Sequence, residues 1–180
     1  MRSTWAQRAR APPWKCFARW LEQPADVVVV GAGGFPKDIN LYQAQKALDN
    51  ARHVVRQNGI LVLVADCREG LGEATFESWM RDPGGPDAIL RRIRREFVLG
   101  GHKAAAVAMT MRQVSISLVS SLQPDFARSL GFTPWPDVNC ATQGALKRSG
   151  SNPFVLVLPE GGSVLPSIRV TGGADSSGTA

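Results

Sequence analysis

Four apolar-rich segments along this chain predict buried strands, at residues 25–31, 60–65, 114–122 and 154–158. The first contains four consecutive valines, and the second is an uninterrupted apolar run. Such runs, bounded by turn-forming residues, are typical of strands covered on both faces, as in a parallel sheet. We therefore expect a sheet that is buried by helices on its two sides.

The segments between these strands carry helical patterns. In the first of them, Leu41, Ala44, Leu48, Ala51 and Val55 recur every three or four positions and form one apolar stripe. A helix is predicted there at about residues 40–57, with Gly59 as the residue that ends it.

Further helices are expected at about 73–81, 87–98, 102–112, 124–130 and 137–147, with a Pro-flanked turn at 133–136. Strands that alternate with helices predict an α/β fold, a three-layer α/β/α sandwich with a mainly parallel, Rossmann-like sheet.

The turn after the first strand holds Gly31, Gly33 and Gly34, so the chain can bend there where side chains would clash. Ligands of open α/β sheets bind at such turns, near the carboxyl ends of the strands. Gly31 and Gly33 match part of a dinucleotide fingerprint, and Asp66 follows the second strand where a ribose-binding acid would lie. The third glycine position holds Pro36, so the match is incomplete.

The net charge of +6 is concentrated at the start of the chain, because residues 1–20 hold five basic and no acidic residues. The nearly neutral remainder gives no electrostatic footprint for nucleic acid. We expect a poorly ordered basic leader at 1–23, one α/β domain at 24–166 and a disordered Gly/Ser/Thr-rich tail at 167–180.

The compartment follows from two further patterns. Cys16, Cys67 and Cys140 are far apart and lack the spacing of a zinc site or a disulfide framework. The chain has no apolar run of about 20 residues, the length that a membrane span needs. We expect a cytoplasmic protein with reduced thiols and with no metal site or membrane partner.

Polar side chains gather at the start of the first helix, where Tyr42, Gln43 and Lys46 share a face. The helix N-terminus, an amide donor and an ammonium group together suit a carboxylate ligand. Alternatively, Asn40 caps the helix with Gln43 as its capping-box partner, and Lys46 is an ordinary surface residue. His53 lies two turns further on and is expected to be solvated.

Four motifs, in order, resemble the C-terminal domain of the nickel-dependent lactate racemase family. They are GGFPKDINLYQAQK at 33–46, EGLG at 69–72, GHKA at 101–104 and PEGGS at 159–163. The similarity runs from about residue 24 to 166, and the first motif is long and specific.

The resemblance implies a racemase or epimerase of small 2-hydroxy acids. The family moves the substrate's α-hydrogen as hydride to and from a nickel-pincer nucleotide. By position in the motif, Gln43 and Lys46 are similar to the residues that orient the substrate for catalysis, and Tyr42 flanks them. His102 and Lys103 lie where family members vary, so they are candidates for substrate specificity.

Family enzymes also have an N-terminal domain, which holds the nucleotide, ligates the nickel and supplies a histidine pair as acid and base. We find no match to that domain here, so we expect a truncated C-terminal half, inactive unless an N-terminal racemase domain binds in trans. Two other possibilities stay open: a stand-alone nucleotide- or carboxylate-binding module, and a non-functional remnant.

Overall fold

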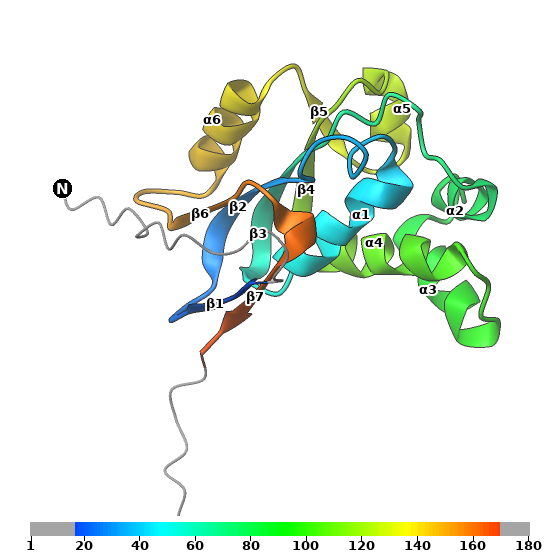
Figure 1. Ribbon diagram of the computed structural model, residues 1–180, viewed down its shortest axis with the longest axis horizontal. Coiled ribbons are helices and arrows are strands. Elements are labelled where there is room, and N and C mark those ends of the chain that lie inside the picture. Colours follow the sequence, from blue (N-terminus) through cyan, green and yellow to red (C-terminus); the bar gives the residue numbers. More distant parts are fainter. Residues whose placement is uncertain (1–16, 170–180) are drawn as a thin grey trace, which may run out of the picture.

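The computed structural model describes residues 17–169, which form a five-stranded parallel sheet in the order β5-β4-β3-β2-β6 (Figure 1). Its strands are β2 (Ala25–Gly31), β3 (Val55–Val64), β4 (Ser115–Val119), β5 (Thr133–Trp135) and β6 (Val155–Leu158). The helices that connect them are α1 (Leu41–Ala51), α2 (Ala74–Met80), α3 (Gly85–Arg95), α4 (Gly101–Gln113), α5 (Pro124–Ser129) and α6 (Val138–Arg148). The short helix η1 (Gly161–Ser163) follows β6.

Helices cover both faces of the sheet, which confirms the predicted three-layer α/β fold. Figure 1 shows α6 on one side and α1 and α4 on the other, with α2 and α3 packed outside α4. Because side chains alternate along a strand, the valines of β2 serve two cores. Val27 and Val29 pack toward α6, whereas Val28 and Val30 pack into the larger core beneath α1 and α4.

The boundary between α1 and β3 was predicted wrongly. The helix ends at Ala51 rather than near residue 57, and Val55, placed on its apolar stripe, begins β3. Gly59 lies inside this strand and does not end the helix. A bulge explains the strand pattern, since Ala25 pairs with Val55 but Val27 pairs with Ile60. A Cβ at Gly59 would lie 2.9 Å from the Asp26 carbonyl oxygen, so the close approach of β2 requires glycine.

The segment at 133–136, expected as a turn, contains β5, whose Pro134 is tolerated because β5 is an edge strand. The remaining predicted strands and helices are present with shifted ends. Asp137 caps α6 as expected, because its carboxylate accepts from the Cys140 amide at 2.8 Å.

A second sheet was not anticipated. β1 (Phe17–Leu21) pairs in parallel with β7 (Val164–Ile168), so the end of the expected leader and the start of the expected tail form regular structure. Residues 1–16 of the expected leader and residues 170–180 of the expected tail lie outside the described residues. Between residues 17 and 169, no helix is long and apolar enough to cross a membrane.

Candidate functional site

The carboxyl ends of β2, β3 and β6 border an open cavity of about 400 Å³. The chain steps from β2 through β3 and β4 to β5 in one direction, and β6 then adds to the other side of β2. Open α/β sheets bind ligands where the strand order reverses in this way. The lining consists of Gly31–Gly34, Val64–Asp66, Asp38, Pro159 and Glu160.

The glycine turn at this cavity differs from a dinucleotide fingerprint. Gly33 and Gly34 have φ values of 101° and 74°, which favour glycine. The following residues form turns, and α1 starts only at Leu41, so its N-terminus does not follow the glycines directly. Asp66, the expected ribose-binding acid, lines the cavity and accepts a hydrogen bond from the Ser121 hydroxyl.

At the start of α1 the expected Asn40 cap is present, whereas the expected capping-box bond from the Gln43 side chain is not found among residues 17–169. Asn40 caps the helix, since its side-chain oxygen accepts from the Gln43 amide at 3.0 Å. The side chains of Gln43 and Lys46 are exposed, and neither forms a hydrogen bond or ion pair within residues 17–169. The cap therefore leaves an amide and an ammonium group free at this end of the helix.

Helix α4 brings a second lysine to the same place. The Lys103 ammonium donates to the Tyr42 carbonyl oxygen at 2.9 Å and lies 3.7 Å from the centre of the Tyr42 ring. Burial lowers the pKa of Lys103, and the positive charge of Lys46 lowers that pKa further. We call Tyr42, Lys46 and Lys103 the two-lysine cluster.

The sequence indicated Lys46 and Lys103 as separate candidates, but it gave no signal that Lys103 contacts the helix that carries Lys46. The Tyr42 ring is also fixed by Phe76, whose ring it meets edge-on with centroids 5.6 Å apart.

His102 adjoins the cluster in sequence and stacks on Phe97, with ring centroids 5.7 Å apart. Its Nδ1 atom is buried and has no hydrogen-bond partner among residues 17–169.

The remaining candidates are less suited to chemistry. Burial and the charges of Asp38 and Asp66 raise the pKa of the Cys67 thiol to about 12, so it is not a thiolate nucleophile at neutral pH. In the described part of the chain, no group of three or more His, Cys, Asp or Glu residues is placed to hold a metal ion.

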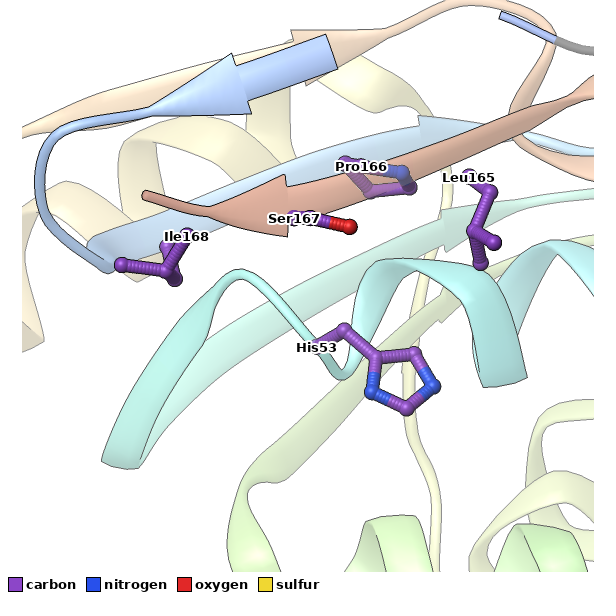
Figure 2. A pocket seen from close by; sticks show the side chains of 5 residues that line it. All are labelled: His53, Leu165, Pro166, Ser167 and Ile168. Carbon is purple, nitrogen blue, oxygen red and sulfur yellow. The ribbon is translucent and has the colours of Figure 1, made fainter. Parts of the chain in front are cut away.

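A second cavity, of about 350 Å³, lies between β7 and the turn after α1. Figure 2 shows the His53 ring below the strand that carries Leu165, Pro166, Ser167 and Ile168. His53 is exposed and follows the C-terminal end of α1, away from Gln43 at its start. It is therefore not part of the two-lysine cluster.

Comparison with known proteins identifies the family. The family model "Lactate racemase C-terminal domain" matches residues 21–166, which is most of the chain. The chain belongs to the lactate racemase C-terminal domain family. This confirms the resemblance that the four sequence motifs indicated.

Two lactate racemases are among the relatives of this chain. It is 25% identical over 148 residues to the enzyme of Thermoanaerobacterium thermosaccharolyticum, covering 79% of this chain and 35% of that protein. It is 26% identical over 145 residues to the enzyme of Lactiplantibacillus plantarum, covering 78% of this chain and 34% of that one. The chain thus spans about a third of the length of these relatives.

Solved structures share the fold. The lactate racemase apoprotein of T. thermosaccharolyticum superimposes with a TM-score of 0.75 at 23% identity, covering 82% of this chain and 36% of that chain. A crystal structure of a protein from Thermotoga maritima superimposes with a TM-score of 0.57 at 12% identity, covering 85% and 39% of the two chains. At these identities the likeness supports the three-layer α/β fold alone.

Proposed function

We propose that this chain is the substrate-orienting domain of a 2-hydroxy-acid racemase or epimerase. The observation that carries the proposal is the free pair formed by Gln43 and Lys46 at the N-terminus of α1. Family membership supports it, because the pair lies in the long motif at 33–46, within the residues that match the family.

The site suits the carboxylate of a small hydroxy acid. The Lys46 ammonium supplies the counter-charge, the Gln43 amide donates a second hydrogen bond, and the N-terminus of α1 adds a favourable dipole. Tyr42, held by Lys103 and Phe76, forms a rigid wall beside them. A carboxylate fixed in this way leaves the substrate with one preferred orientation of its α-hydrogen, as hydrogen transfer requires.

The nickel-pincer nucleotide is assigned to another domain. No cluster in the described part of the chain fits a metal ion, so we derive no step of the reaction through the nucleotide. The proposal is that an N-terminal racemase domain, binding in trans, holds the nucleotide and supplies the acid and base. The chain alone is then inactive.

A second candidate is a ligand-binding module without chemistry of its own. The cavity of about 400 Å³ at the reversal of strand order favours it, since a nucleotide or carboxylate could bind there independently of α1. The two candidates differ in where a hydroxy acid binds.

The test is a titration of the ¹⁵N-labelled chain with D- and L-lactate, followed by NMR. We expect the largest chemical-shift changes at Gln43 and Lys46. Lys46→Ala should weaken the binding of lactate about tenfold or more, as the loss of a charge-assisted hydrogen bond predicts. Lys147→Ala, on the exposed end of α6, is the matched control and should change nothing. Shift changes confined to Gly31–Gly34 and Glu160 would instead support the binding module.

A further inference from the structure

The two-lysine cluster carries more positive charge than a monocarboxylate neutralises. Lys103 of α4 contacts Tyr42 of α1, and Lys46 lies on α1 about one helical turn after Tyr42. The described residues form six ion pairs, and neither lysine takes part in one. Neither ammonium group therefore has a carboxylate within ion-pair distance in the described part of the chain.

Of the two lysines, Lys103 has the greater need of a negatively charged partner. It is half-buried, and its contacts are uncharged: the Tyr42 carbonyl oxygen and the face of the Tyr42 ring. Charges removed from water are normally paired, because an unpaired one costs free energy. A single carboxylate bound by Lys46 would leave the Lys103 charge uncompensated.

The geometry places the two charges within reach of one small molecule. Lys103 meets α1 at the Tyr42 carbonyl, and Lys46 begins four residues later, which is roughly 6 Å of helical rise. Both lysine side chains are long enough to adjust to a ligand between them. The ammonium of Lys103 has three donors, and one hydrogen bond is made to Tyr42.

We propose, on the basis of the proposed function, that the substrate is a 2-hydroxy acid with a second carboxylate. Lys46 and Gln43 bind the carboxylate next to the hydroxyl group, and Lys103 binds the carboxylate at the other end. Lys103 thereby determines specificity, in addition to holding Tyr42 in place.

The experiment compares the binding of four acids to the full chain by calorimetry at one ionic strength. The probes are lactate, 2-hydroxysuccinate, 2-hydroxyglutarate and 3-phospholactate, the last of which replaces the second carboxylate by a phosphate. We expect one of the two dicarboxylates to bind at least fivefold more tightly than lactate and more tightly than 3-phospholactate.

Two substitutions of Lys103 separate specificity from structure. Lys103→Met should reduce the preference for the dicarboxylate to about onefold, because the dicarboxylate loses more affinity than lactate does, and Lys103→Arg should keep the preference. A merely structural role would weaken the binding of lactate and the dicarboxylate equally, which would overturn the proposal. The Tyr42 ring resonances report whether Lys103→Met has displaced that side chain. If Lys103→Met has displaced the Tyr42 side chain, the test uses Lys103→Gln instead, which retains a hydrogen-bond donor. This variant must then abolish the preference for the dicarboxylate over lactate.

The outcomes distinguish the two proposals. Equal affinity for lactate and both dicarboxylates would contradict the proposal that the substrate has a second carboxylate. It would leave the proposed carboxylate site at Lys46 intact. Tighter binding of 3-phospholactate would overturn it in favour of a phosphorylated hydroxy acid. Failure of all four acids to bind at millimolar concentration would contradict both this proposal and the proposed function.

Discussion

At the scale of single residues, Tyr42 connects the helices that build the site. Its ring packs against Phe76 of α2. The Lys103 ammonium of α4 donates to its carbonyl oxygen and contacts the face of its ring. These contacts fix the ring, whereas the exposed Gln43 side chain forms no hydrogen bond among residues 17–169, and its backbone amide donates to the Asn40 cap. The same helical turn thus holds one residue rigidly and presents the next one to a ligand.

Gln43→Glu should separate stability from binding. Gln43 is the third helical residue after the Asn40 cap, where a glutamate favours the helix through the capping box and the dipole. The added negative charge, however, repels a carboxylate ligand. We expect the melting temperature to stay the same or rise while lactate affinity falls about tenfold or more.

Gln43→Ala is the control, because it removes the amide without adding a charge and should weaken binding less. Lactate affinity that survives Gln43→Glu unchanged would place the carboxylate elsewhere.

Asp26 should make the stability of the domain depend on pH. Its carboxylate accepts from the Phe154 amide at 2.7 Å and from Arg56 at 2.6 Å, and these bonds lower its pKa. Since the folded-state pKa is depressed, this stabilisation is present in full above about pH 4, the ordinary carboxyl value, and is lost as the pH falls below it.

Asp26→Asn should therefore cost about 1 kcal/mol in the free energy of unfolding at pH 7, and much less at pH 3. Urea denaturation at the two pH values measures the difference. Asp125→Asn serves as the control, since Asp125 is exposed and bonds to Arg128 of the same helix. Equal losses at both pH values would show that the charge of Asp26 does not contribute.

At the scale of elements, the short helix η1 lies against α1 and β2. The Asn50 side chain of α1 donates to the Gly161 carbonyl oxygen at 2.8 Å. A Cβ at Gly161 would overlap the Val30 side chain and would lie 3.2 Å from the Ala47 Cβ. Gly161, the first glycine of the PEGGS motif, is thus required for packing beside β2, the strand that ends at the cavity.

Gly161→Ala should lower the free energy of unfolding by about 1–3 kcal/mol through overpacking. Gly162→Ala is the matched control, because its Cβ would approach only the Ala32 carbonyl oxygen, at 3.3 Å. Chemical denaturation of the two variants tests the difference. A Gly161→Ala variant as stable as Gly162→Ala would show that η1 can move away at little cost.

Some strands and helices could be predicted from the sequence and others could not. Apolar runs predicted β2, β3 and β4, since strands buried on both faces leave a strong local signal. An apolar run also predicted β6, although this edge strand is only partly buried and its Val157 is exposed. β1, β5 and β7 were missed, because short strands at sheet edges depend on a distant partner. The end of α1 was misjudged because the bulge at Gly59 disguised the start of β3.

For the site, the local motif at 33–46 predicted Tyr42, Gln43 and Lys46 at one end of a helix, and the structure brings them there. The contact between Tyr42 and Lys103 was not predictable, because 61 residues separate them and only the packing of α4 on α1 joins them.

At the scale of the whole molecule, the chain has a complete core but covers about a third of the lactate racemases that it resembles. Its exposed large apolar side chains include two that directly precede α4, the helix that carries Lys103: Phe97, which stacks on His102, is 76% exposed, and Leu99 is 74% exposed. Exposed apolar residues beside a polar site suit contact with another domain. This agrees with the proposal that the site is completed in trans.

The most direct measurement is a racemisation assay by chiral chromatography. It uses D- and L-lactate, 2-hydroxysuccinate and 2-hydroxyglutarate with the chain alone, with a nucleotide-loaded N-terminal racemase domain alone, and with both together. We predict interconversion of at least one acid in the mixture only, and its loss when the chain carries Lys46→Ala. Interconversion by the chain alone, or none in a mixture shown to form a complex, would contradict the account.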